Sequence, residues 1–560
     1  MRKSTNLSWP DERREFPQRP WPGNRQPLWR QFARTREAGV TDTTMKNTVR
    51  TLLLSALLGA ALCPLATPPA AAQNVERLAR SLSLQDCWLL ALKHNFDVQI
   101  QRLAPVIDQY NLNGAYGAWD PTYSFSAQQR YNAFLGGFNS QTGLQPPPSE
   151  SYDEIFGTGL TGLAPSGLTY SLSGNLDRNS GTSISVGPDG SIVARDRGFQ
   201  YQPSLGLQMR QPLLKNFWTD QARMNIQVNK RLLKIDEQVL RGQIINTVTL
   251  VQQAYYDLIY AYENVKVQQK ALELAQRLLA ENKKRVEVGA MAPLDEKSAE
   301  SQAAISRAAL LGAQQSLATQ QNTLKNLIID DYSNWHDVEV QPAEKLMPQP
   351  ALFDLQASWQ NGLTQRADLL QARLDMERRN IVLRYQYNQL FPQLDLFGTY
   401  GRNGLERTLV PSLDQIDDNQ APNWSYGASV SIPLSNRTAR NAYKATKAAK
   451  QQALLQLKQL EQTIMVQIDN GIKVAQASYE QLDATRQARE FAQAALEAEQ
   501  KKLENGKSTS YQVLLLQRDL TQRSSDEIQA LAQYNKALAA LAQAEGTTLE
   551  KNQLTVEVRP

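Results

Sequence analysis

One segment of this chain is present twice. Residues 82–97 are LSLQDCWLLALKHNFD and residues 353–368 are FDLQASWQNGLTQRAD. Adding 271 to the residue number aligns five identical residues of this segment, namely Leu84, Gln85, Trp88, Leu92 and Asp97, with their counterparts in the second. A repeated unit indicates a fold built from copies of one structural element. The duplication therefore constrains the architecture more strongly than any other feature of the sequence.

The match continues to the far end of the chain with a decreasing offset in residue number. The offset is 271 at Pro121 and Pro392, 221 at Pro212 and Pro433, and 217 at Gly289 and Gly506. The first decrease gives copy one 50 extra residues between Pro121 and Pro212, in a region rich in Gly, Ser, Asn and Pro. The second decrease is four residues within a helical pattern, and it nearly preserves the apolar face because a helical turn takes about 3.6 residues.

The N-terminal region predicts export. Residues 51–62, TLLLSALLGAAL, form an apolar core, with Lys46 and Arg50 before it and the A-x-A pattern Ala70–Ala72 after it. This pattern is typical of a secretory signal peptide, here over 45–72 with its start at Met45. Residues 1–44 are then either a wrongly assigned or disordered extension, or a functional basic arm.

The basic charge of the chain comes from its N-terminal region. Residues 1–44 hold nine Lys or Arg and five Asp or Glu, so they contribute +4 of the net charge of +5. Lys46 and Arg50 add two more, which leaves the chain from Gln73 at about −1. A mature chain of this charge gives no reason to expect nucleic-acid binding.

Few residues after the signal peptide suggest reactive chemistry. Cys87 is the single cysteine there, so we expect no internal disulfide, and on a helix it is most simply a small buried hydrophobic residue. His94 and His336 are far apart, and no metal-ligand spacing, nucleophile motif or nucleotide-binding motif is present. We therefore expect neither enzyme activity nor a metal or cofactor.

Each copy predicts the order helix, strand, loop, strand, long helix, tight turn, helix. The strands are expected near 121–131, 201–211, 392–401 and 424–433, where apolar and polar residues alternate. About ten residues is the length that a tilted transmembrane strand requires. A sheet half buried in a soluble core would alternate in the same way, but the signal peptide and the long helices favour a membrane. The insertion at 132–200 is expected to be an extracellular loop; an alternating run from Leu168 to Gly174 leaves open whether it adds strands.

The helices are long and follow a heptad pattern. No proline and one glycine, Gly242, lie between Pro212 and Gly289, and about 70 residues in a helix span about 100 Å. Apolar residues recur every seven positions at Leu258, Val265, Leu272, Leu279 and Val286, which indicates supercoiled helices. Four strands per chain are too few to close a barrel, and open strand edges are not tolerated in lipid, so several chains must pool their strands.

The ordered, duplicated motifs are similar to those of the TolC family of outer membrane efflux proteins. The resemblance extends from about Leu82 to Gly546. Its motifs are LALKHNFD, AWDPTYSFS before the first strand, MRQPLLKNF and VSIPLSNRT between strand and helix, and RVEVGAMAPLDEKSAES and KKLENGKSTSYQVLLLQRDL at the helical turns.

The resemblance implies a fold and a set of partners. The fold is an α+β membrane protein, a trimeric channel-tunnel whose shared 12-stranded transmembrane β-barrel continues into a periplasmic α-helical barrel. The implied partners are a periplasmic adaptor, an inner membrane RND or ABC transporter and outer membrane lipid. The chain divides into a first repeat (82–330), a connecting segment (331–352), a second repeat (353–545) and a tail (546–560).

The resemblance also places candidate site residues. Gly289 and Gly506 correspond to the helical-hairpin tips near 289–295 and 505–512 that dock the adaptor, and Pro212 and Pro433 to the transitions from strand to helix. Asp295 occupies the position of a gate aspartate of the family. The second copy departs from the family pattern, with Gln512 and Leu515 where acidic residues are typical and Lys507 one position from a typical arginine. We expect Asp295 and Lys507 of neighbouring hairpins to hold the entrance closed; alternatively, both are solvated turn residues.

The sequence thus predicts a gated outer membrane channel subunit of a tripartite efflux pump or type I secretion system. The main alternative is an exported coiled-coil scaffold without channel activity, and an exported enzyme is the other. No residue identifies the cargo or the pump class.

Overall fold

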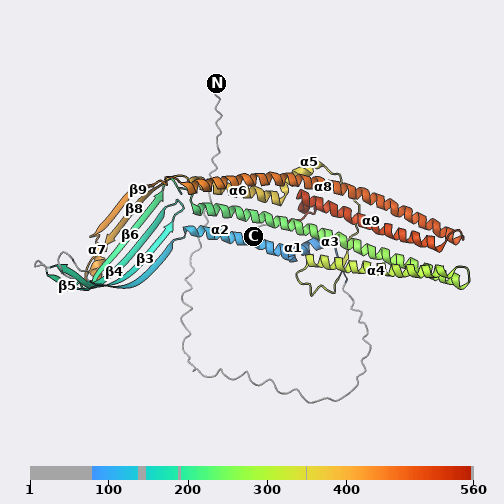
Figure 1. Ribbon diagram of the computed structural model, residues 1–560, viewed down its shortest axis with the longest axis horizontal. Helices are drawn as coiled ribbons and strands as arrows, with labels where there is room; N and C mark the ends of the chain where they lie inside the picture. The colour runs from blue at the N-terminus through green and yellow to red at the C-terminus, as the bar shows by residue number, and fades with distance from the viewer. Residues whose placement is uncertain (1–78, 136–146, 187–190, 349, 556–560) are drawn as a thin grey trace, which may run out of the picture. The chain divides into compact units, whose positions relative to one another are not determined.

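The computed structural model describes residues 79–135, 147–186, 191–348 and 350–555, which all lie in one compact unit spanning Glu76–Pro560. The predicted signal peptide at 45–72 and the extension at 1–44 lie outside the described residues. Figure 1 shows the unit as a sheet at one end of a set of long helices, with two helical turns at the other end.

The helices occur in pairs with the spacing of the sequence repeat. Helices α1 (Leu84–His94) and α5 (Leu355–Gln365) begin and end at positions that differ by 271. Helices α4 (Pro293–Ile328) and α9 (Ser510–Glu545) have 36 residues each, and their first and last positions differ by 217. The remaining pairs are α2 (Phe96–Tyr116) with α6 (Ala367–Asn388), and α3 (Gln221–Glu287) with α8 (Arg437–Glu504).

The main sheet has seven antiparallel strands in the described residues. Six of them follow the order β2-β3-β4-β6-β8-β9, and β5 pairs with the end of β4. Their bounds are β2 Thr122–Phe134, β3 Ser149–Leu163, β4 Thr169–Val186, β5 Ile192–Asp196, β6 Gln200–Pro212, β8 Gln393–Asn403 and β9 Pro422–Ser431. A separate parallel pair joins β1 (Ala79–Leu82) to β7 (Glu339–Pro342). The short helices are η1 (Gly117–Trp119), α7 (Leu409–Asp417) and α10 (Thr548–Lys551).

The strand count corrects the expectation of four strands per chain. The insertion at 132–200, expected as a loop, contains β3, β4 and β5. β3 pairs with β2 over thirteen residue pairs, and β4 pairs with β6, so the insertion lies inside the sheet. Several of the Ser and Asn residues that suggested a loop lie on the polar face of these strands, Ser171, Ser173 and Asn175 among them.

The two faces of the sheet differ in chemistry. One register row crosses the six strands on one face through Tyr123, Leu160, Leu172, Leu207, Tyr400 and Trp424. The neighbouring row on the opposite face passes through Thr122, Thr161, Ser171, Gln208, Thr399 and Ser425. Successive residues of a strand point to opposite faces, so one face is apolar and the other carries hydroxyl and amide groups.

Helix α3 lies at the centre of the helical part. It packs against α4 to form the first hairpin, and also against α2, α6 and α9, while α8 and α9 form the second hairpin. The largest apolar cluster joins α1, α3 and α4 around Tyr255, Leu258 and Leu324. Cys87 lies in this cluster with no exposed surface, and burial raises the pKa of its thiol to about 12, which confirms it as a small buried residue.

None of the helices in the described ranges is both long enough and apolar enough to cross a membrane.

Candidate functional site at the helix tips

The two helical hairpins end in the same turn. Gly289 and Gly506 follow the last residues of α3 and α8 with φ values of 72° and 68°. In the first turn Ala290 N–H donates to the Arg285 carbonyl at 2.8 Å, and in the second Lys507 N–H donates to the Lys502 carbonyl at 2.8 Å. These six-residue bonds and the left-handed glycines define a Schellman motif, in which glycine carries no Cβ penalty. The equivalent glycines of the two copies therefore reverse the chain in the same way.

A buried polar contact joins the two hairpins near their tips. Asn282 on α3 is 1% exposed, and its Oδ1 accepts a hydrogen bond of 3.0 Å from Ser510 Oγ, which is 2% exposed, at the start of α9. Asn282 Nδ2 donates at 3.4 Å to the carbonyl of Asp295 in the first turn of α4. One asparagine thus ties the first residues of α4 to those of α9, and removing a partner of so buried a group costs about 1–3 kcal/mol.

The three candidate gate residues lie around this contact. The side chain of Asp295 is half-buried in the first turn of α4, while Lys507 and Gln512 are exposed at the second tip. Within the described part of the chain, no ion pair joins Asp295 to Lys507. The structure therefore places the two charges at the tips of different hairpins without pairing them inside one chain.

A second anchor holds the tip of copy two. Ser508 Oγ donates to Glu499 Oε1 at 2.5 Å and Lys502 Nζ donates to Glu499 Oε2 at 2.9 Å. The hydrogen bond from Ser508 is the main reason that the pKa of Glu499 lies below its usual value, with Lys502 adding to the effect. The turn that carries Lys507 is thus fixed to the end of α8.

A groove of about 410 Å³ lies beside the tips, between the first turns of α4 and α9. Its lining combines apolar side chains, most of them exposed, with polar residues and two cations: Leu294, Lys297, Ser298, Ser301, Gln302, Tyr511, Leu514, Leu515 and Arg518. Leu294 is 75% exposed, and Lys297 pairs with Glu300 on its own helix at 2.7 Å. An apolar groove with a basic rim can hold an apolar side chain beside a carboxylate.

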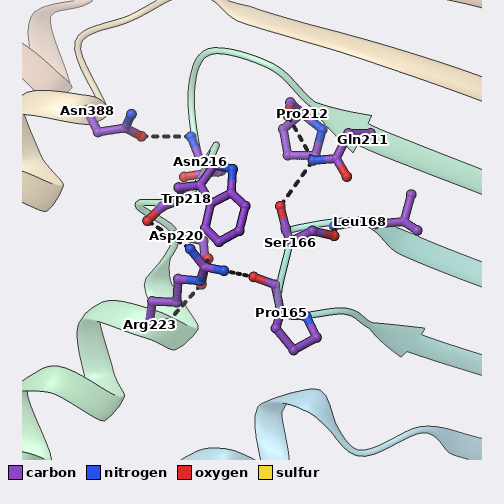
Figure 2. A network of polar contacts seen from close by, with 10 residues as sticks. All are labelled: Pro165, Ser166, Leu168, Gln211, Pro212, Asn216, Trp218, Asp220, Arg223 and Asn388. Atoms are coloured by element: carbon purple, nitrogen blue, oxygen red, sulfur yellow. Dashed lines mark hydrogen bonds and ion pairs between the residues drawn. The ribbon is translucent and has the colours of Figure 1, made fainter. Parts of the chain in front are cut away.

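The transition from sheet to helix in copy one is held by polar contacts (Figure 2). Pro212 ends β6, and the next residues turn back through Asn216 and Trp218, which have left-handed φ values of 66° and 51°. The Asn216 N–H donates to Asn388 Oδ1 of α6 at 2.7 Å. A tryptophan rarely adopts such a conformation, so the surrounding contacts must fix it.

Arg223 supplies most of those contacts. Its guanidinium lies 4.3 Å from the centre of the Trp218 ring, donates to the Trp218 carbonyl at 3.2 Å and also donates to the Pro165 carbonyl (Figure 2). The Asp220 side chain accepts from the Arg223 N–H at 2.9 Å and so caps α3. In copy two, Pro433 is exposed and Asn436 precedes α8 without a side-chain cap.

Two features of the site were missed in the sequence. Asn282 lies three residues after Leu279, which belongs to the heptad series. Three residues is the spacing between the two core positions of a heptad, so a polar residue at a core position was the available signal. Arg210 and Asp395, which form an ion pair between β6 and β8, gave no signal, because their pairing depends on which strands become neighbours. The described residues contain no cluster of His, Cys, Asp and Glu suited to a metal.

Comparisons with known proteins agree with this arrangement. A family model described as outer membrane efflux protein matches residues 166–328 and 359–547, one segment in each copy and together well over half of the chain. The comparison with curated proteins gave no match.

Solved structures show the same fold. The CmeC outer membrane channel of Campylobacter jejuni has a TM-score of 0.60 at 15% identity, covering 85% of this chain and 87% of that one. VceC of Vibrio cholerae has a TM-score of 0.59 at 18% identity, covering 83% and 96%. The open state of the MtrE channel of Neisseria gonorrhoeae has a TM-score of 0.56 at 17% identity, covering 83% and 89%.

Proposed function

This chain belongs to the outer membrane efflux protein family and lies in the outer membrane with a large periplasmic portion; we propose that it is the passive channel subunit of an export system. Substrates pass from the periplasm to the exterior through a tube that several chains form together. The driving energy comes from an inner membrane transporter.

The two-faced sheet carries this proposal. The apolar row from Tyr123 to Trp424 faces lipid, and the row from Thr122 to Ser425 faces a water-filled lumen. Trp424 is 69% exposed and Tyr426 is 81% exposed in the single chain, and their rings stack with centroids 5.9 Å apart. A soluble protein would cover such a face, whereas aromatic residues of this kind are enriched where membrane strands meet the bilayer interfaces.

The surfaces that one chain leaves open support the proposal that several chains assemble, as a homotrimer. β2 and β9 are the edges of the main sheet in the described residues, and unpaired edges are not tolerated in lipid. Three chains that each contribute the six strands from β2 to β9 would close a barrel of eighteen strands, in place of the twelve expected from the sequence.

The duplication indicates how the helices of neighbouring chains meet. In copy two, α6 packs against both α3 and α8. In copy one, the equivalent helix α2 packs against α3, while a heptad stripe on it stays exposed at Phe96, Ile100, Leu103, Ile107 and Tyr110. The equivalent neighbour of α2 is α8 of the next chain, where Leu454 and Leu455 are exposed in the matching stretch. A ring of chains repeats the α3–α6–α8 packing at every boundary.

The helix tips form the gated periplasmic entrance. Asp295 of one hairpin and Lys507 of a neighbouring hairpin attract one another across the closed entrance, and the contact between Asn282 and Ser510 couples the two tips of each chain. The groove beside them, with Leu294 and Arg518, receives the helical hairpin of a periplasmic adaptor, whose binding separates the tips. The adaptor links the channel to an RND or ABC transporter, in an efflux pump or a type I secretion system.

A matched pair of variants tests the channel directly. Leu207→Arg places a charge on the apolar face of β6 and is expected to destabilise the sheet by about 2–4 kcal/mol in a bilayer. Gln208→Arg, one residue further on the opposite face, is expected to keep the fold and to change the conductance of the protein in planar bilayers. Wild-type protein that gives no conductance after purification from the outer membrane in mild detergent would favour the scaffold alternative.

A further inference from the structure

The short helix α7 lies on the apolar face of the sheet. Two residues on the same face of β8 hold it: Arg402 Nη1 donates to the Ile416 carbonyl at 3.1 Å, and Tyr400 OH donates to Asn419 Oδ1 at 3.3 Å. At Gly404 the backbone approaches so closely that an added Cβ would collide with the Ser412 carbonyl oxygen. The connection between β8 and β9 therefore folds back onto the face proposed to meet lipid.

An open cavity of about 330 Å³ lies where α7 meets the strands. Its walls are mainly apolar and include Phe125, Phe156, Leu176, Leu205, Leu413 and Ile416, and no charged residue lines it. Phe125 is 66% exposed, and Phe156, Leu205 and Leu413 are each 42–45% exposed. A volume of about 300 Å³ or more is typical of a small-ligand site.

The register of the sheet fixes the depth of this cavity. Leu205 lies in the row of Phe125, and the next row away from the helices pairs Phe156 with Leu176. One row further, Glu154 and Arg178 form an ion pair of 2.9 Å. In the strands from β2 to β6, the cavity thus occupies the last two apolar rows before this ion pair, on the side opposite the periplasmic helices.

We propose that this cavity binds an acyl chain of an outer-leaflet lipid, an inference that rests on the proposed function because it requires the apolar face to meet the bilayer. Water in the cavity would find few polar groups there to bond with, whereas an acyl chain fills an apolar wall in the hydrocarbon layer. α7 then clamps the chain against the strands. Its exposed Leu409 and Val410, 38% and 67% exposed, continue the apolar surface beside it.

The test counts lipids bound to the full-length protein purified from outer membrane in mild detergent. Palmitoyl-oleoyl phosphatidylglycerol is added as the probe, and native mass spectrometry measures its affinity for the wild type, for Leu413→Trp, which fills the cavity, and for Leu413→Asn, which makes its wall polar. Both variants are expected to bind the probe about tenfold more weakly. The control Val410→Trp adds the same ring to α7 outside the cavity lining and is expected to stay within about twofold of wild type.

Equal binding by the wild type and both Leu413 variants would overturn the proposal, as would an equal loss in the control. Wild-type protein that binds no probe, together with a trimer that falls apart in Leu413→Trp, would assign the cavity to a neighbouring copy and also overturn it. The conductance of the wild type distinguishes failure of the cavity proposal from failure of the proposed channel function. A conducting channel without the lipid effect rejects the cavity alone, and a protein that fails to conduct rejects the proposed function.

Discussion

The two copies of the unit meet once inside the chain and leave the equivalent surfaces open at its edges. Inside the chain, β6 pairs with β8, and α6 fills the space between α3 and α8. At the edges of the described sheet, β9 and β2 each pair on one side only, and the stripe on α2 is exposed. None of the residues of α6 equivalent to that stripe is fully exposed: Ala367 is 7% exposed and the other four are partly buried. The difference supports the proposal that several chains assemble into one ring.

The pairing of β6 with β8, here called the inner seam, also differs in chemistry from the open edges of β2 and β9. Arg210 Nε donates to Asp395 Oδ2 at 2.9 Å across the inner seam, and Asp395 is 1% exposed. The equivalent residues at the edges are Ser431 on β9 and Ser124 on β2. The pairing of β6 with β8 is therefore specified by charge within the chain, whereas the open edges of β9 and β2 carry hydroxyl groups in the same places.

Breaking the inner seam is expected to have the largest effect. Arg210→Ala leaves the buried Asp395 carboxylate without a cation, with Gln393 Nε2 at 2.8 Å as its remaining side-chain donor, and is expected to cost about 3–5 kcal/mol. Urea unfolding from lipid vesicles measures the loss, and Ser431→Ala, the change at the equivalent open edge, is expected to leave the unfolding midpoint unchanged. Equal midpoints for wild type and Arg210→Ala would show that the ion pair does not stabilise the seam.

The second effect concerns the exposed stripe on α2. Ile107→Asp removes apolar contact and buries a charge at each boundary between chains, with an expected cost of about 3 kcal/mol per boundary. Native mass is expected to shift from trimer to monomer, while Ile107→Leu keeps the trimer. Arg378, the equivalent residue in α6, already pairs with Asp375 at 2.6 Å inside the chain, so Arg378→Ala is expected to keep the trimer as well.

The third effect concerns a contact that the two copies build differently. In copy one, Cys87 and Ile328 are fully buried in an apolar cluster. In copy two, the equivalent residues are Ser358 and Glu545, and Ser358 Oγ donates to Glu545 Oε1 at 2.7 Å. Burial alone would raise the pKa of Glu545, but hydrogen bonds from Lys551 and Ser358 outweigh it and lower the pKa below the ordinary 4.5.

A carboxyl with a lowered folded-state pKa stabilises the protein above its ordinary pKa, and this contribution disappears as the pH falls through the lowered value. Glu545→Gln is therefore expected to lose about 1.5–3 kcal/mol at pH 7, a difference that shrinks below pH 4.5. Unfolding followed from neutral to acid pH checks this. A difference that stays constant across the range would rule out the carboxylate as its source, and the exposed Glu504→Gln serves as the control.

The smallest effect is expected at the tips. An exposed ion pair contributes about 0–1 kcal/mol, so Asp295→Ala with Lys507→Ala is expected to raise the conductance of the closed channel modestly. The difference in conductance between the double variant and the wild type should shrink as the salt concentration rises, because salt screens the exposed charges of the wild type. Gln512→Ala at the same tip is the uncharged control. Conductance identical to wild type in the double variant would reject the proposed pairing of the two charges.

The sequence by itself determined the repeated plan of the molecule. Alternation located β6, β8 and β9, the absence of proline marked the long helices, and glycine marked both tips, because each signal is local and acts on the backbone within a few residues. The duplication also identified which parts of the two copies correspond.

Only the tertiary structure decided where the insertion and the buried polar residues lie. The Gly- and Ser-rich segment at 132–200 was expected as a loop, but β3 and β4 find partners in β2 and β6, and strand pairing depends on neighbours that are distant in sequence. Asn282 and Ser510 are 228 residues apart, and Arg210 and Asp395 are 185 apart. A hydrogen bond across such a separation exists only after two chain segments pack together, so no local sequence pattern predicts which residues will be partners.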